Sequence, residues 1–177
     1  KAKKAGYAAR SIYKLEEMDK KYKLLKNGQK VLDLGAFPGS WSQYALKKVG
    51  PKGIVVGIDI QNIEKSFAPN HIFLHKSILD ADLDFSQYAP FHLVLSDMAP
   101  NTTGVKDVDQ MGSIELSEMA VEMAKKYMKK DGIFICKIFQ GEGFDEFYKI
   151  LKSVFVKMKS FKPEATRSNS KEIYAIG

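Results

Sequence analysis

Apolar runs of strand length alternate with amphipathic stretches along the chain. The apolar runs occupy residues 30–35, 53–60, 71–78, 91–100 and 133–139. Apolar side chains recur at helical spacing in residues 9–22, 40–50, 112–130 and 144–156. Two further short strands, around residues 157–161 and 172–176, form a predicted terminal hairpin. This alternation predicts an α/β fold.

One lysine interrupts the apolar run at residues 133–139. Every other residue from Ile133 to Phe139 is apolar, which is typical of a fully buried strand. An unpaired buried ammonium costs several kcal/mol or loses its proton. Lys137 is therefore either paired with carboxylates or valuable because its pKa has moved, and Glu172 is one candidate partner for it.

A glycine turn, DLGAFPGSW, follows the first predicted strand. Gly35 and Gly39 allow the backbone to approach a ligand at the carboxyl end of that strand, where doubly wound sheets bind nucleotides. Pro38 occupies the middle, so the turn lacks the GxGxxG spacing used for a dinucleotide pyrophosphate. Asp59 ends the second strand, where an acidic residue accepts hydrogen bonds from ribose hydroxyls. These features indicate S-adenosylmethionine, although a purely structural turn is the alternative.

Composition indicates one soluble globular domain spanning residues 1–177. The chain is 45% hydrophobic and 28% charged, and its apolar runs are too short to cross a membrane. A cytoplasmic protein is the default expectation, or an organellar matrix protein in a eukaryote. The single Cys136 is interpreted as core, and the three histidines lack partner cysteines at metal-ligand spacing, so no metal is expected.

Charge is concentrated at the two ends of the chain. The net charge is +7, yet residues 1–30 carry nine lysines and Arg10 against three acidic residues, and residues 147–177 are also basic. A basic N-terminal helical extension is expected at about residues 1–27. Basic ends favour a polyanionic partner such as nucleic acid. The alternative is the ordinary lysine-rich surface of a lysine-biased proteome.

Several motifs resemble one family over essentially the whole chain. RSIYKL, DLGAFPGSWSQY, LSDMAPN, KIFQGEGFDE and SKEIY are similar to the FtsJ/RrmJ family of S-adenosylmethionine-dependent RNA 2′-O-ribose methyltransferases. The resemblance implies a Rossmann-like fold with a seven-stranded, mostly parallel sheet, one antiparallel strand and helices on both faces. FQGEGFDE further resembles the branch that methylates a uridine of large-subunit ribosomal RNA in bacteria and organelles.

The resemblance also implies the site residues. A Lys-Asp-Lys-Glu catalytic tetrad falls on Lys14, Asp97, Lys137 and Glu172. The expected cofactor-binding residues are Gly35, Pro38, Gly39, Trp41, Asp59, Ser77 and Asp97. Ser77 departs from the family, which has an acidic residue there; Asp80 or the backbone around Ser77 would have to replace it. Trp41 either forms a wall of the cofactor pocket or packs in the core.

The resulting hypothesis is that Lys137 takes the proton of a ribose 2′-hydroxyl, or stays protonated and orients it. Arg10, Lys14 and Arg167 are expected to bind RNA phosphates, since arginine grips phosphate in two places. The partner would be ribosomal RNA within the large ribosomal subunit, and the protein would be a monomer.

Rival functions are methylation of tRNA or of an mRNA cap, methylation of a small molecule, a catalytically idle role in ribosome assembly, and an NAD-dependent oxidoreductase.

Overall fold

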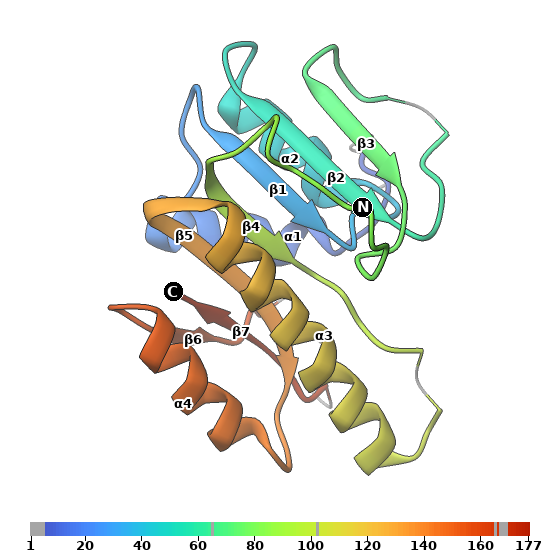
Figure 1. The fold of residues 1–177 in the computed structure, drawn as a ribbon, viewed down its shortest axis with the longest axis vertical. Coiled ribbons are helices and arrows are strands. Elements are labelled where there is room, and N and C mark those ends of the chain that lie inside the picture. The colour runs from blue at the N-terminus through green and yellow to red at the C-terminus, as the bar shows by residue number, and fades with distance from the viewer. Residues whose placement is uncertain (1–5, 65, 102, 165, 167–169) are drawn as a thin grey trace.

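Seven strands form a single sheet in the order β3-β2-β1-β4-β5-β7-β6 (Figure 1). The computed structural model describes residues 6–64, 66–101, 103–164, 166 and 170–177. The strands are β1 Lys30–Leu34, β2 Ile54–Asp59, β3 His71–His75, β4 Phe91–Ser96, β5 Met128–Phe139, β6 Lys159–Phe161 and β7 Glu172–Ile176. The helices are α1 Ile12–Tyr22, α2 Ser40–Val49, α3 Lys106–Tyr127 and α4 Phe144–Val154.

The pairing of the strands confirms the expected sheet. Strands β3, β2, β1, β4 and β5 pair in parallel, whereas β7 runs antiparallel to both β5 and β6. Parallel strands place all their carboxyl ends at one edge, and the reversed β7 brings its amino end to that same edge. This arrangement gathers residues from both ends of the chain.

Two layers of helices cover the sheet (Figure 1). Side chains on successive strand residues point to opposite faces, so Val31 packs with α1 and α2 while Leu32 packs with α3 and α4. The apolar side chains at helical spacing in α1 were predicted to be Ile12, Leu15, Met18 and Tyr22; the first three are buried and Tyr22 is partly buried against the same cluster. The basic N-terminal segment therefore contributes a core helix to the fold.

The boundary between α3 and β5 differs from the sequence prediction. The helix expected at residues 112–130 begins at Lys106 and ends at Tyr127, and β5 starts at Met128 instead of Ile133. Asp131 has a left-handed backbone (φ 60°), and the register with β4 shifts between Phe91 and Leu93. The Asp131-Gly132 pair is thus an irregularity within a strand and not a helix stop.

Two smaller observations concern the interior and the helices. Cys136 is fully buried, and burial raises the pKa of its thiol to about 12. Among the described residues, the helices are too short or too polar to span a bilayer.

Candidate active site

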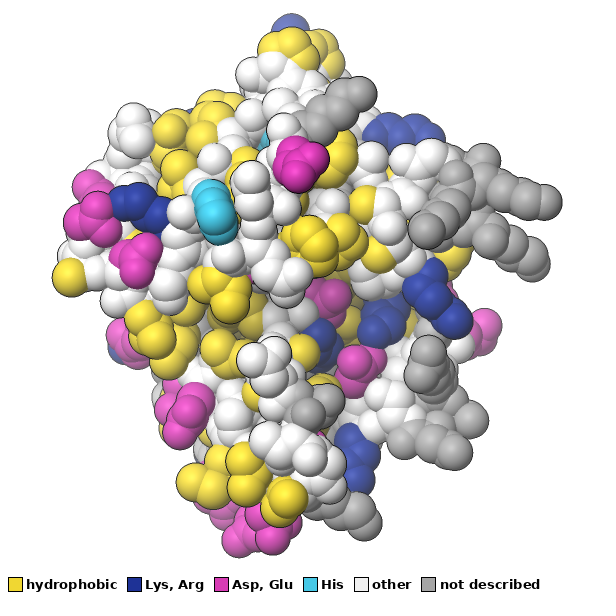
Figure 2. All heavy atoms as spheres, turned by 90° about the vertical axis from the view of Figure 1, so that its right-hand side faces the viewer, with side chains coloured by type: hydrophobic (Ala, Val, Ile, Leu, Met, Phe, Trp, Pro, Cys, Tyr) yellow, Lys and Arg dark blue, Asp and Glu magenta, His cyan; other side chains and the backbone are white. Residues whose placement is uncertain are grey.

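The carboxyl edge of the sheet holds the residues singled out in the sequence. Gly35 follows β1, Asp59 ends β2, Ser77 follows β3, and Asp97 follows β4. Glu172 begins the antiparallel β7 and so lies at this edge as well. Figure 2 shows acidic and basic side chains gathered in a hollow on the side of the molecule at the right of Figure 1.

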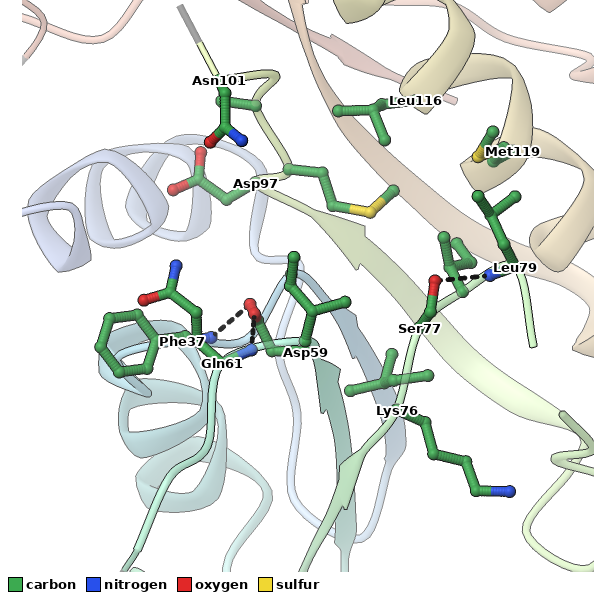
Figure 3. Close-up of a pocket in the computed structure, with 16 residues that line it drawn as sticks. Phe37, Asp59, Gln61, Lys76, Ser77, Leu79, Asp97, Asn101, Leu116 and Met119 are labelled. Carbon is green, nitrogen blue, oxygen red and sulfur yellow. Dashed lines mark hydrogen bonds between the residues drawn. The ribbon is translucent and has the colours of Figure 1, made fainter.

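A cavity of about 370 Å³ opens at this edge between β1, β2, β4 and α3 (Figure 3). Its polar lining includes Asp59, Ser77 and Asp97. Its apolar lining includes Ile58, Ile78, Leu79, Met98, Leu116 and Met119. An apolar cavity with a few placed polar groups is the usual form of a small-molecule site.

Gly35 forms part of the cavity wall, where a side chain would not fit. Its φ of 74° is in the left-handed region, and a Cβ there would lie 2.6 Å from Cγ of Met98. Gly39 (φ 103°) turns the chain into α2, and a Cβ there would overlap the ring of Phe67. Gly39 and Pro38 shape the turn, but they are not among the residues that line the cavity.

Asp59 presents its carboxylate to the cavity from the end of β2 (Figure 3). Oδ2 accepts a hydrogen bond from the backbone N–H of Phe37 (2.9 Å), and Oδ1 accepts one from Gln61 (2.8 Å). Each carboxylate oxygen has two lone pairs. Asp59 can therefore hold the glycine turn in place and still accept hydrogen bonds from a diol.

Ser77 lines the cavity, whereas Asp80 does not. The Asp80 carboxylate accepts the backbone N–H of Ser77 (3.0 Å), and Oγ of Ser77 accepts the N–H of Leu79 (3.1 Å). Asp80 therefore stabilises the turn after β3. Two replacements for the missing acidic residue were considered, Asp80 and the backbone around Ser77. Only the segment around Ser77 lines the cavity.

The four tetrad residues form two close pairs. Nζ of Lys137 lies 2.6 Å from the backbone carbonyl oxygen of Asp97 and 3.2 Å from its Oδ1. Nζ of Lys14 lies 2.6 Å from Oε2 of Glu172. Lys137 is thus paired with a carboxylate, but the partner is Asp97 and not the candidate Glu172, which pairs with Lys14. Lys137 is only 7% exposed, so Asp97 holds its side-chain nitrogen in a largely dry environment.

Tyr174 is a polar partner of this cluster that the sequence interpretation missed. Its hydroxyl donates to Oδ1 of Asp97 at 2.7 Å, and it lies opposite Lys137 in the β5–β7 pairing. Burial, followed by the nearby Asp97, raises the pKa of the Tyr174 hydroxyl well above its usual value. It therefore remains a donor at every physiological pH. The available signal was its position two residues after Glu172, which places both side chains on one face of β7.

Trp41 lies behind the tetrad and is not among the cavity-lining residues. Its ring centroid is 5.7 Å from that of Tyr174, and its indole N–H donates to the backbone oxygen of Ser11 at 3.0 Å. Trp41 therefore joins α2 to α1 and supports the ring that holds Asp97.

Asp33 is a buried carboxyl group beneath the glycine turn. Oγ of Ser42 donates to its Oδ2 at 2.6 Å, while Oδ1 has no hydrogen-bond partner among the described residues. Burial raises the pKa of Asp33 from 3.8 to about 7, and the charges of Asp97 and Asp59 add to the rise. Asp33 thus titrates near neutrality without being exposed.

Of the two arginines expected to bind RNA, Arg10 is exposed just before α1, one turn ahead of Lys14. Arg167 lies outside the described residues. Arg10 is therefore the one of the two that the structure describes, one turn before Lys14 in the chain.

The sequence matches the profile of a known family over residues 7–177, described as FtsJ-like methyltransferase. A relative from Desulfatibacillum aliphaticivorans, named ribosomal RNA large subunit methyltransferase E, is 50% identical over 100% of this chain and 86% of its own length. The match thus extends from Lys14 to Glu172 and includes both halves of the tetrad.

Solved structures share the architecture. A ribosomal RNA methyltransferase from Plasmodium falciparum superposes with a TM-score of 0.85 at 29% identity, covering 96% of each chain. A fibrillarin from Aeropyrum pernix, solved with natively bound S-adenosyl-L-methionine, gives a TM-score of 0.60 at 13% identity, over 86% of this chain and 67% of that one. The second likeness concerns the fold alone.

Proposed function

We propose, for a chain that belongs to the FtsJ-like methyltransferase family, that it transfers a methyl group from S-adenosylmethionine to a ribose 2′-hydroxyl of large-subunit ribosomal RNA. The observation that carries this proposal is the double role of Asp97. Its side chain lines the cofactor-sized cavity and also holds Lys137 and Tyr174. Cofactor site and proton-handling groups therefore meet at one residue.

The cavity residues fit S-adenosylmethionine. Asp59 offers carboxylate oxygens for the ribose diol, and Gly35 leaves room beside Met98 that a side chain would fill. Ile78, Leu79 and Met119 offer apolar surface for a flat base. When bound, this cofactor supplies an electrophilic methyl group on a positively charged sulfur, whose charge the carboxylate of Asp97 complements.

Lys137 handles the proton of the attacking hydroxyl. A neutral amine can donate two hydrogens to the carbonyl and carboxylate oxygens of Asp97 and keep its lone pair for the hydroxyl proton. An ammonium with the same two contacts keeps its third hydrogen to orient the hydroxyl oxygen, and the proton then leaves late. In either state the two contacts to Asp97 fix the nitrogen of Lys137. The hydroxyl is then held in one position, and holding reacting groups in position can itself accelerate a reaction strongly.

The other members of the cluster position these groups. Tyr174 holds Oδ1 of Asp97 on the side of β7. Nζ of Lys14 donates one hydrogen to Oε2 of Glu172 (2.6 Å). An ammonium has three hydrogens, so Lys14 keeps two that it can donate to a phosphate of the RNA. Arg10, one turn earlier in the chain, is exposed and adds a positive charge that can bind the same strand.

Ribosomal RNA is the substrate class that the relatives support. The bacterial relative is named for the large-subunit RNA, and the Plasmodium structure for ribosomal RNA. The basic N-terminal segment supplies the positive charge that such a substrate requires. The protein acts as a monomer, in the compartment where ribosomes assemble, which is the cytoplasm in bacteria.

The test is methylation in vitro followed by mass mapping. Purified protein is incubated with methyl-tritiated S-adenosylmethionine and with large ribosomal subunits that lack 2′-O-methylation, and the labelled RNA is digested and mapped. The expected product is one 2′-O-methylated nucleotide in large-subunit RNA, absent with Lys137→Ala. Label found only in tRNA or capped mRNA would support the alternative substrates. No transfer to any RNA, with intact cofactor binding, would favour an idle assembly factor.

A further inference from the structure

Two lysines lie over a pair of aromatic rings where α1 ends beside the edge strand β6. The rings of Tyr22 and Phe161 meet edge to face, with centroids 5.8 Å apart. Nζ of Lys21 lies 4.9 Å from the centroid of Phe161 and 5.4 Å from that of Tyr22. Nζ of Lys159 lies 4.9 Å from the centroid of Tyr22. We call these four residues the lysine–aromatic surface.

Among the described residues, no carboxylate is paired with the two lysines of this surface. Within the described part of the chain, neither Lys21 nor Lys159 forms an ion pair, whereas neighbouring Lys20 pairs with Glu16 (3.0 Å). Both lysines are exposed. Cation–π attraction to the rings restricts each ammonium to a small region without using its hydrogens. The two ammonium groups can therefore donate to an anion.

The surface is connected to the active site along one face of α1. Lys14 and Lys21 are seven residues apart, which is two helical turns or about 10 Å along the axis, so both lie on the same face. Lys14 contacts Glu172 on β7, and Lys21 contacts Phe161 on β6, whose backbone pairs with Tyr174 of β7. The face thus runs from the tetrad across β7 to the sheet edge.

The acidic residue on the same face does not block this path. Glu17 lies between Lys14 and Lys21, and its Oε2 accepts the backbone N–H of Glu164 at 2.7 Å. Its carboxylate is directed to the connection between β6 and β7. The lysines are therefore the groups on this face that are available to an RNA strand.

We infer that the lysine–aromatic surface binds the phosphates of the RNA strand that leads away from the methylated nucleotide. The inference rests on the proposed function, and it adds a second contact region about two helical turns from the tetrad. Because phosphate contacts position a strand without reading its bases, this surface contributes affinity that does not depend on sequence.

The test compares two matched double variants. Lys21→Ala/Lys159→Ala removes the surface. Lys126→Ala/Lys152→Ala removes lysines that also lie over tyrosine rings, 4.7 Å from Tyr127 and 5.1 Å from Tyr148, on the opposite face of the sheet. Binding of a fluorescein-labelled single-stranded oligouridine is measured by anisotropy across a salt series.

Removal of the surface should make the negative slope of log K against log salt shallower by about 1.4, or about 0.7 for each lost contact. Affinity should fall by about tenfold at physiological salt. The Lys126/Lys152 variant should keep the wild-type slope. An unchanged slope in the Lys21/Lys159 variant would overturn the inference, while methyl transfer by the wild-type protein would leave the proposed function standing.

A second measurement uses the unmodified protein. Lysine acetylation with and without the oligouridine, read by mass spectrometry, should show protection of Lys21 and Lys159 but not of Lys126 and Lys152. Equal acetylation of Lys21 with and without RNA would contradict the inference. Failure of the wild-type protein to bind or methylate any RNA would instead remove the proposed function itself.

Discussion

The hydroxyl of Tyr174 lies 2.7 Å from Oδ1 of Asp97, the same oxygen that lies 3.2 Å from Nζ of Lys137. Tyr174 and Lys137 are direct partners across β7 and β5, so two adjacent strands hold one carboxylate oxygen from two directions. This oxygen is fixed by rigid sheet backbone, which is the kind of support that keeps catalytic groups in position.

Tyr174→Phe should lower the rate of methyl transfer with little change in cofactor affinity. The variant keeps the ring that packs on Trp41 but removes a buried donor, a loss of about 1–3 kcal/mol. Steady-state kinetics should show kcat reduced by about tenfold or more, and calorimetry an S-adenosylmethionine affinity close to wild type.

The matched control for Tyr174 is Tyr44→Phe. Tyr44 is also buried, and its hydroxyl donates to Oδ2 of Asp19 at 2.9 Å, away from the tetrad. This variant should lose stability but keep kcat. If both variants lost kcat equally, the Tyr174 effect would be one of general stability.

Lys137→Ala should reduce methyl transfer by about 10² to 10⁴, the usual contribution of a proton-handling group. Lys137→Arg should also fail, because a guanidinium cannot give up its proton and cannot reproduce the compact ammonium. Cofactor binding by calorimetry should remain nearly intact in both.

Lys30→Ala is the control for this change. Lys30 is a strand lysine bonded to a backbone carbonyl, that of Tyr88 at 3.0 Å, at the amino end of β1. It should retain normal turnover. Near-normal turnover in Lys137→Ala would exclude Lys137 from the reaction.

Gly35→Ala should weaken S-adenosylmethionine binding by tenfold or more. The new Cβ would lie 2.6 Å from Cγ of Met98, so Met98 must move within the wall of the cavity. A left-handed backbone costs a non-glycine residue about 1–2 kcal/mol in addition.

Gly28→Ala separates these two effects. Gly28 has a φ of 81°, and nothing lies within 4 Å of a Cβ built there. It should show the stability loss, measured by chemical denaturation, without the affinity loss. Equal cofactor affinities in the two alanine variants would argue against Gly35 as a cofactor-site residue.

Asp33→Asn should remove a pH-dependent loss of stability. The folded-state pKa of Asp33 is raised by burial to about 7 from 3.8. Between these values the unfolded chain loses this proton while the folded protein keeps it. Folding stability therefore falls as pH rises, by up to about 1.4 kcal/mol per pH unit, and the loss is complete above the folded pKa.

The measurement is urea denaturation of wild type and Asp33→Asn at several pH values. As the pH rises from about 4 to about 7, the free energy of unfolding of the variant should increase relative to that of wild type. Above about pH 7 the difference between the two proteins should stay constant. The other carboxyl groups are common to both proteins, so they cancel. A pH-independent difference would mean that Asp33 is ionised throughout.

Much of the fold followed from the sequence because strands and glycine turns have strong local signals. The turn around Gly35, the acidic end of β2 at Asp59 and the strand that carries Lys137 were all predictable. The start of α3 was not, because Val108 and Met111 in its first turns are exposed and give no buried stripe. Its first turns are instead joined to the preceding loop by Asp109, which accepts the N–H of Thr103 at 2.6 Å.

The sequence predicted which residues form the site better than it predicted which of them contact each other. Sequence similarity indicated Lys14, Asp97, Lys137 and Glu172, but not which carboxylate faces which lysine. That choice depends on side-chain direction at the ends of three strands and a helix. Tyr174 was missed because an aromatic residue in an apolar strand looks like core, and its hydroxyl matters only once Asp97 is placed beside it.

The antiparallel direction of β7 has a consequence for how the enzyme becomes active during synthesis. The contact between Lys14 and Glu172 joins residues 158 positions apart, whereas the described cavity is lined by residues from Gly35 to Met119. A nascent chain that has left the ribosome only as far as α3 contains the residues that line the cavity, but it lacks β5, against which β4 and α3 pack, and it lacks Lys137, Glu172 and Tyr174. The tetrad can therefore form only after the last strand has been made, so a chain that terminates before β7 lacks Glu172 and Tyr174 and cannot assemble it.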